Sequence, residues 1–101
     1  MAIDITLQYF DGCPNWKIVD REISEAIDNL GISAEVRYQK VESYDEAERL
    51  GFRGSPTILI SGRDPFADDN APVGLSCRVY RTDVAPTGSP SIKALERALR
   101  A

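Results

Sequence analysis

The sequence predicts one α/β domain in which helices cover both faces of a four-stranded mixed sheet, in the order β-α-β-α-β-β-α. Two observations support this class. Short segments that alternate apolar and polar side chains take turns with longer segments of helical period. The length of 101 residues suits a single hydrophobic core.

The first part of the chain predicts a strand, a helix and a second strand. Residues 4–10 alternate apolar and polar side chains, which is typical of a strand. From Pro14 to Leu30 apolar residues recur at helical spacing, and Gly31 marks the end of the helix. Residues 35–41 predict the second strand. Because a helix connects these two strands by a right-handed crossover, we expect them to be parallel.

The middle of the chain predicts a short helix, a strand and a loop. Residues 43–46 have the pattern of a capping box, so a helix should begin there and end near Leu50. Residues 57–60 form an apolar strand. Residues 61–76 contain Gly, Pro, Asp and Asn without a sustained period, which predicts a long loop.

The last part predicts a fourth strand and a third helix. Residues 77–82 alternate, and we expect this strand to lie antiparallel beside the third one because no helix separates them. After a turn at 83–88, Ser89 should cap a helix that has Pro90 at its first position. The expected buried stripe of this helix comprises Ile92, Leu95 and Leu99.

Composition disfavours several classes of function. A net charge of −4 and scattered arginines argue against a nucleic-acid partner, which needs clustered basic residues. No apolar run approaches the roughly 20 residues that cross a bilayer, so no membrane partner is expected. The chain has no histidine, and its two cysteines cannot alone complete a tetrahedral zinc site. We therefore expect no cofactor and no resident metal, and leave the oligomeric state open.

The first residues, Met1 to Asp4, show no basic stretch followed by an apolar one. A signal peptide has both, so the sequence favours a cytoplasmic location.

Cys13 is the candidate catalytic residue. It lies where the first strand gives way to the first helix, and Pro14 suits the first helical position. Unpaired backbone N–H groups and the macrodipole stabilise a thiolate at such a point, so we expect an accessible thiol of lowered pKa. The alternative is a small apolar residue that packs at a helix end.

Three features together resemble the thioredoxin-like superfamily. They are the order of the elements, the strand-Cys-Pro-helix junction at 10–16, and Ser55-Pro56-Thr57 ahead of the third strand. The resemblance implies a thioredoxin-like fold, a cis peptide bond at Pro56, and Cys13 as the attacking thiol across the site. We expect a substrate-binding surface made of Pro14, Trp16, Ser55, Pro56 and Thr57, although packing is the favoured role for Trp16. More narrowly, the runs Cys-Pro-Asn-Trp, Gly-Ser-Pro-Thr, Gly-Arg-Asp-Pro-Phe and Gly-Leu-Ser-Cys-Arg are similar to a group of small bacterial proteins of this superfamily, some labelled alkylmercury lyase.

The chain departs from the dithiol pattern because Trp16 stands where Cys-x-x-Cys proteins carry their second cysteine. We predict a thiol-dependent oxidoreductase or thiol-transfer protein in which Cys13 acts on a small thiol or a protein disulfide. Three versions stay open at this point. An external thiol such as glutathione resolves the mixed disulfide, Cys77 resolves it, or the fold is a non-catalytic binding module. Handling of mercurials or soft metal ions by Cys13 and Cys77 is a further alternative.

Cys77 is expected to lie far from Cys13. In an antiparallel pair it would face Ile60, and a four-residue strand spans roughly 13 Å, whereas a disulfide needs Cα atoms within roughly 7 Å. A role in the core or in anchoring the loop is therefore favoured, unless the 61–76 loop shifts the register or folds back over the site.

Two further groups are weaker candidates. Residues 87–89 could bind a carboxylate at the start of the last helix, although plain capping is favoured. Three loop carboxylates are interpreted as a solvated acidic surface rather than a metal site, and these are Asp64, Asp68 and Asp69.

Overall fold

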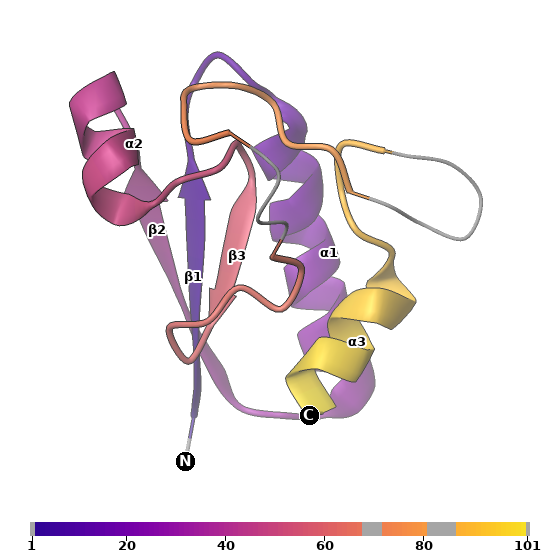
Figure 1. The fold of residues 1–101 in the computed structure, drawn as a ribbon. Coiled ribbons are helices and arrows are strands. Elements are labelled where there is room, and N and C mark those ends of the chain that lie inside the picture. The colour runs from indigo at the N-terminus through magenta and orange to yellow at the C-terminus, as the bar shows by residue number, and fades with distance from the viewer. Residues whose placement is uncertain (1, 68–71, 81–86, 101) are drawn as a thin grey trace.

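The computed structural model is an α/β fold of three strands and three helices in the residues that it describes, which are 2–67, 72–80 and 87–100 (Figure 1). The elements follow in the order β1 (Ile3–Tyr9), α1 (Asn15–Leu30), β2 (Ala34–Lys40), α2 (Tyr44–Leu50), β3 (Thr57–Ile60) and α3 (Ile92–Arg100).

The sheet has the strand order β2-β1-β3. β1 and β2 are parallel, with Ile5 opposite Val36, which confirms the prediction for the first two strands. β1 and β3 are antiparallel, with Leu7 opposite Ile58. The prediction of a four-stranded sheet is wrong, because the described residues form three strands only.

The segment predicted as the fourth strand makes isolated backbone bridges instead. Cys77 pairs in the parallel sense with Ser55, ahead of β3, and Tyr80 pairs with Thr87. Pro56, which stands between Ser55 and β3, has no N–H to donate, and its carbonyl accepts a hydrogen bond from the Tyr80 hydroxyl. A regular ladder therefore does not extend along β3, and the expected antiparallel pairing is wrong. Residues 81–82 of the predicted strand and most of the 83–88 turn lie outside the described part.

Residues close in sequence determine where α1 ends and where α2 begins. α1 ends at Gly31, which adopts a left-handed φ of 61° that glycine reaches without a Cβ penalty. At the start of α2, the Ser43 hydroxyl accepts the Glu46 N–H at 3.1 Å, while the Glu46 carboxylate accepts the Glu42 N–H at 2.9 Å. The Ser43 bond is the first half of the predicted capping box, while the Glu46 side chain reaches the N–H one residue before the N-cap.

The last helix begins later than the sequence predicts. α3 starts at Ile92, because Ser91 is the residue whose hydroxyl accepts the Ala94 N–H, at 3.1 Å. The expected start at Pro90 with Ser89 as cap is therefore wrong. Residues 87–89 do not stand at a helix start, so the carboxylate-binding alternative loses its basis.

The main core lies between the sheet and the pair α1 and α3, which run side by side on one side of it (Figure 1). Its buried members include the strand residues Ile5, Leu7 and Ile58 and the helix residues Val19, Ile23, Ala26, Leu95 and Leu99. α2 stands on the opposite side and packs around a second, smaller cluster, which is Val41, Ala47 and Phe52. Removal of this apolar surface from water drives the assembly of the layers.

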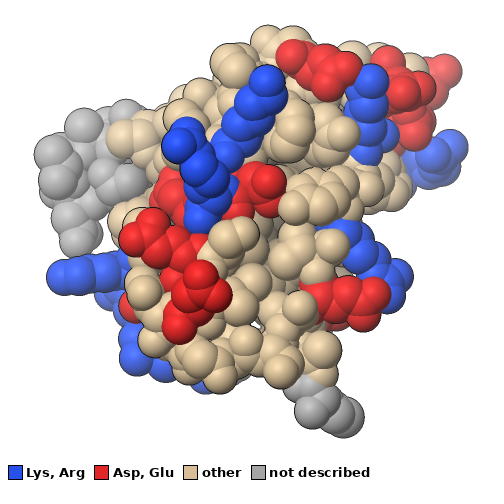
Figure 2. Space-filling model, turned by 180° about the vertical axis from the view of Figure 1, so that it is seen from behind, with Lys and Arg blue, Asp and Glu red and all other residues tan. Residues whose placement is uncertain are grey.

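Charge is mixed on the face that Figure 2 shows. Lysine and arginine side chains lie interspersed with aspartate and glutamate over that face, so neither sign forms a continuous field there. In the described part of the chain, none of the helices has the length and apolar character needed to span a membrane.

Candidate functional site

Cys13 lies in the tight turn that joins β1 to α1. Its N–H donates to the Phe10 carbonyl at 3.3 Å, and Pro14 is the N-cap of α1, with its carbonyl accepting the Lys17 N–H at 3.1 Å. Among the described residues no side chain caps this helix, and its first turn carries no acidic residue. The positive end of the α1 macrodipole therefore meets the Cys13 turn, and the carboxylate present in that turn, Asp11, is paired with Lys40 at 2.7 Å.

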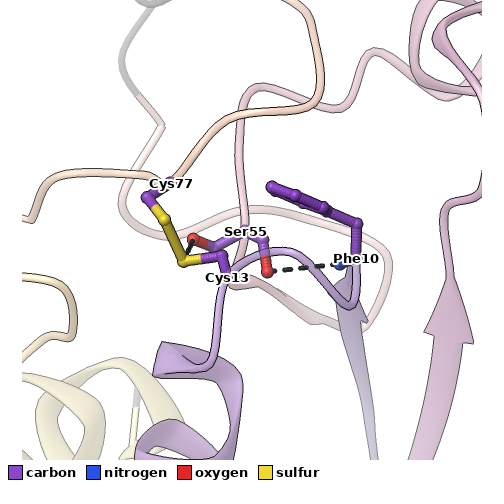
Figure 3. Close-up of a disulfide and its surroundings, with 4 residues drawn as sticks. All are labelled: Phe10, Cys13, Ser55 and Cys77. Carbon is purple, nitrogen blue, oxygen red and sulfur yellow. Dashed lines mark hydrogen bonds between the residues drawn. A yellow bond between two sulfur atoms is a disulfide. The ribbon is translucent and has the colours of Figure 1, made fainter.

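Cys13 is disulfide-bonded to Cys77, with the two Cα atoms 5.6 Å apart (Figure 3). The two ends of the bond differ in exposure, because Cys13 is completely buried whereas Cys77 is an exposed residue. The predicted helical turn after Cys13 is present, but the expected accessibility of Cys13 is wrong. Only the Cys77 end of the pair is at the surface.

The prediction that Cys77 lies far from Cys13 is wrong as well. Cys77 lies beside Ser55 rather than beside Ile60, because the described residues just before it, 74–76, bond to the segment that leads into β3. The Ser55 N–H donates to the Ser76 carbonyl at 2.8 Å, and the Arg78 N–H donates to the Ser55 carbonyl at 2.8 Å. The long loop thus folds back over the site, which was the alternative to a remote position.

Ser55 is the point where the three segments of the site meet. Its fully buried side chain accepts the Phe10 N–H through Oγ at 3.3 Å, and its carbonyl oxygen lies 3.5 Å from Cys13 Sγ (Figure 3). The bond between Ser55 and Pro56 is cis, as the resemblance implied. The site therefore brings together the β1–α1 turn, the residues ahead of β3, and the segment around Cys77.

Arg78 attaches the segment around Cys77, residues 75–80, to the interior of the protein. Its guanidinium is buried and forms two hydrogen bonds with the Asp64 carboxylate, of 2.6 and 3.3 Å. It also donates to the Phe66 carbonyl and, at 3.3 Å, to the Thr57 hydroxyl. The cation lies 4.6 Å from the centre of the Tyr80 ring. Such a set of charge-assisted hydrogen bonds gives a buried arginine the partners it needs.

Tyr80 and Gly54 also help to attach the segment around Cys77 to the interior of the protein. The Tyr80 hydroxyl donates to the Pro56 carbonyl, and burial raises the pKa of Tyr80 well above its usual range. A Cβ on Gly54 would lie 3.0 Å from Arg78 Cβ and 3.1 Å from Arg78 Cα, and the φ of Gly54 is +119°. Only glycine fits this close approach of the two backbones without strain.

The segment around Cys77 alternates as the sequence predicts, with one face buried and the other exposed. Val79 is 67% exposed, whereas Arg78 and Tyr80 are buried. The apolar side chain lies outside because the two polar ones find hydrogen-bond partners inside. The sequence did not predict the partners that Arg78 and Tyr80 find inside the protein. The shared period of two was the signal that places them on one face, and periodicity alone did not show which face is inside.

The predicted substrate-binding residues divide into two groups. Pro56 and Thr57 are buried beside Ser55, and the Thr57 hydroxyl donates to the Gly54 carbonyl at 2.7 Å. Pro14 is exposed, and Trp16 is half-buried and stacks on Tyr9 with ring centres 4.3 Å apart. This stacking agrees with a packing role for Trp16. A substrate-binding role for either group stays a prediction.

Metal-binding side chains do not gather in the described residues. Across 2–67, 72–80 and 87–100, no three His, Cys, Asp or Glu side chains come close enough to hold an ion. Asp64 is engaged by Arg78, and the other two loop aspartates considered with it, Asp68 and Asp69, lie outside the described residues.

No protein-family model matches this chain, and no curated protein matches it. Arguments about function therefore rest on the geometry of the site.

Proposed function

We propose that this protein is a thiol–disulfide oxidoreductase whose redox couple is Cys13 and Cys77. One observation carries the proposal, namely a disulfide at a helix N-terminus with one buried and one exposed cysteine. Exchange begins when a thiolate attacks an accessible sulfur, and it is faster when the leaving thiolate is stabilised. The Cys77 end meets the first requirement, and the start of α1 meets the second at Cys13.

The reductive half of the cycle involves two exchanges. An external thiolate such as glutathione attacks Cys77 Sγ, forms a mixed disulfide there, and releases Cys13 as a thiolate. A second external thiolate then attacks the external sulfur of the mixed disulfide, which releases the Cys77 thiolate and leaves oxidised external thiol. Both cysteines end up reduced, and two external thiols have become one disulfide.

The oxidative half uses the same atoms in the opposite direction. The Cys77 thiolate attacks a substrate disulfide, which forms a mixed disulfide and releases one substrate thiolate. The Cys13 thiolate then attacks Cys77 Sγ, so that the Cys13–Cys77 bond forms again and the second substrate thiolate leaves. The two cysteines therefore exchange the roles expected from the sequence, since Cys77 attacks the substrate and Cys13 resolves the mixed disulfide.

A cytoplasmic location is part of this proposal. Reducing compartments keep most thiols reduced, and a disulfide that forms there is usually transient and catalytic. In the cytoplasm a small thiol is the reductant, and a protein disulfide or a glutathione mixed disulfide is the substrate.

The experiment follows glutathione adducts by mass spectrometry in two single variants. Reduced protein is mixed with oxidised glutathione, and the modified cysteine is identified over time. We expect Cys13→Ser to accumulate a stable adduct on Cys77, since no second thiol resolves it. We expect Cys77→Ser to be modified much more slowly, because Cys13 is buried. Wild type should pass through a short-lived adduct to the intramolecular disulfide.

Turnover is measured as reduction of a glutathionylated peptide, with both single variants and the double variant as controls. Loss of turnover in both single variants supports the two-thiol cycle. A folded wild-type protein whose disulfide is not reduced by glutathione would exclude the cycle, because the bond would then be a structural crosslink.

A second candidate function is the handling of a soft metal ion or a mercurial as cargo. The paired sulfurs favour it, since thiolates select soft cations and the described residues offer no third ligand. Reduced protein should bind one mercuric ion per chain with both sulfurs, and each single Cys→Ser variant should bind it far more weakly. Equal binding by Cys77→Ser and wild type would exclude a two-sulfur site.

A further inference from the structure

Arg78 is the residue next to the exposed cysteine, and its contacts do not involve either sulfur. Its backbone N–H bonds the Ser55 carbonyl, and its buried guanidinium bonds Asp64, Phe66 and Thr57. Ser55 and Thr57 lie around the start of β3 and Ser55 also contacts Cys13, whereas Asp64 and Phe66 belong to the loop that follows β3. Reduction of the disulfide therefore leaves all of them in place.

We propose that Arg78 is a positioning residue for the redox couple, and that with Asp64 it keeps the Cys77 thiol against Cys13 after reduction. The proposal rests on the function proposed above. Its consequence is a high effective concentration of one thiol at the other. The closed disulfide is then strongly favoured over two free thiols, and a mixed disulfide on Cys77 is resolved rapidly by Cys13.

The covalent chain alone would not give a high effective concentration of one thiol at the other. The two cysteines are 64 residues apart, and a loop of that length has a substantial closure entropy when nothing holds its ends. The Arg78–Asp64 pair is well suited to supply the restraint, because the arginine side chain is 5% exposed and the aspartate side chain 20% exposed. Ion pairs shielded in this way are screened by salt much less than surface pairs.

Substitution of Arg78 or Asp64 should change the equilibrium between the dithiol and the disulfide. In Arg78→Met the segment loses the guanidinium contacts but keeps its backbone bonds to Ser55, so the reduced protein gains more freedom than the disulfide form, in which the bond still ties Cys77 to Cys13. The equilibrium therefore shifts toward the dithiol. The reaction measured is dithiol protein plus oxidised glutathione giving disulfide protein plus two reduced glutathiones, in which atoms and electrons balance.

The experiment equilibrates each protein in glutathione redox buffers at neutral pH, with acid quenching and mass analysis of the alkylated thiols. We expect the equilibrium constant for disulfide formation to fall about tenfold in Arg78→Met, which corresponds to a potential about 30 mV less negative. Asp64→Asn, a smaller change at a partly exposed position, should shift it in the same direction by about threefold. Arg78→Lys should recover part of the loss, because it keeps the charge but not the fork geometry.

The matched control is Leu99→Ala, which removes a buried side chain of the main core and touches none of the site. It lowers stability without loosening the Cys77 segment, so its equilibrium constant should equal that of wild type. Wild-type constants in both Arg78→Met and Asp64→Asn would overturn the proposal. An equal shift in Leu99→Ala would overturn it too, since the effect would then be one of stability. If folded wild type is not reduced by glutathione at all, the proposed function fails instead, whatever the variants do.

Discussion

Reduction of the Cys13–Cys77 bond should lower the free energy of unfolding by about 4 kcal/mol. The bond closes a loop with a sequence separation of 64 residues. For a loop of that size the chain-entropy relation gives a loss of about 14 cal/mol/K in the unfolded chain, which is about 4 kcal/mol near room temperature. Since small domains are stable by only about 5–15 kcal/mol, the reduced protein should be distinctly less stable yet still folded.

Urea unfolding followed by Trp16 fluorescence measures this difference, because Trp16 is the chain's one tryptophan and stacks on Tyr9. The oxidised protein, the protein kept in a phosphine reductant, and Cys77→Ser are compared at one temperature. Cys77 is exposed, so its replacement should reproduce the reduced protein closely. Cys77→Ser should also be insensitive to the reductant, which makes it the control.

A difference below about 1 kcal/mol between oxidised and reduced protein would refute this reasoning. Such a result would mean that the bond does not restrict the unfolded chain, or that the reduced form gains compensating contacts. Thiol titration of the folded protein before each measurement shows that the oxidised sample carries the bond.

Substitutions at three residues, Arg78, Tyr80 and Gly54, test the contacts that hold the segment around Cys77 in place. Arg78→Met should lower stability by about 3–5 kcal/mol in urea unfolding, because it leaves the Asp64 carboxylate partly buried without its cation; a loss below about 1 kcal/mol would contradict this. Tyr80→Phe should cost about 1–2 kcal/mol, since the buried Pro56 carbonyl loses its donor. The pKa of Tyr80 is raised on folding, so wild-type stability should fall by about 1.4 kcal/mol per pH unit above about pH 10, where only the unfolded chain loses that proton. Tyr80→Phe should lack this component, and an unchanged slope would count against burial as its cause. Gly54→Ala should destabilise by more than about 1 kcal/mol and speed reduction of the disulfide by dithiothreitol, because its Cβ pushes against the Arg78 backbone; wild-type stability would show that the approach relaxes freely.

The sequence by itself determined most of the local structure. Apolar periodicity over a few residues predicts the three strands and the three helices. Glycine after the last apolar residue marks the ends of α1 and α2. The turn at Cys13 was predicted in the same way. The cis bond at Pro56 was expected from a resemblance to known proteins, not from local propensity.

Only the tertiary structure decided which cysteines meet and which face of the 75–80 segment is buried. Periodicity places Arg78 and Tyr80 on one face but carries no information about partners such as Asp64, which lies 14 residues away. The pairing of Cys13 with Cys77 depends on where residues 76–78 lie, and hydrogen bonds with Ser55 and Asp64 place them beside the start of β3. A satisfied polar group can be buried where pattern rules expect an apolar one, so periodicity could not show that Arg78 lies inside or that Cys77 meets Cys13.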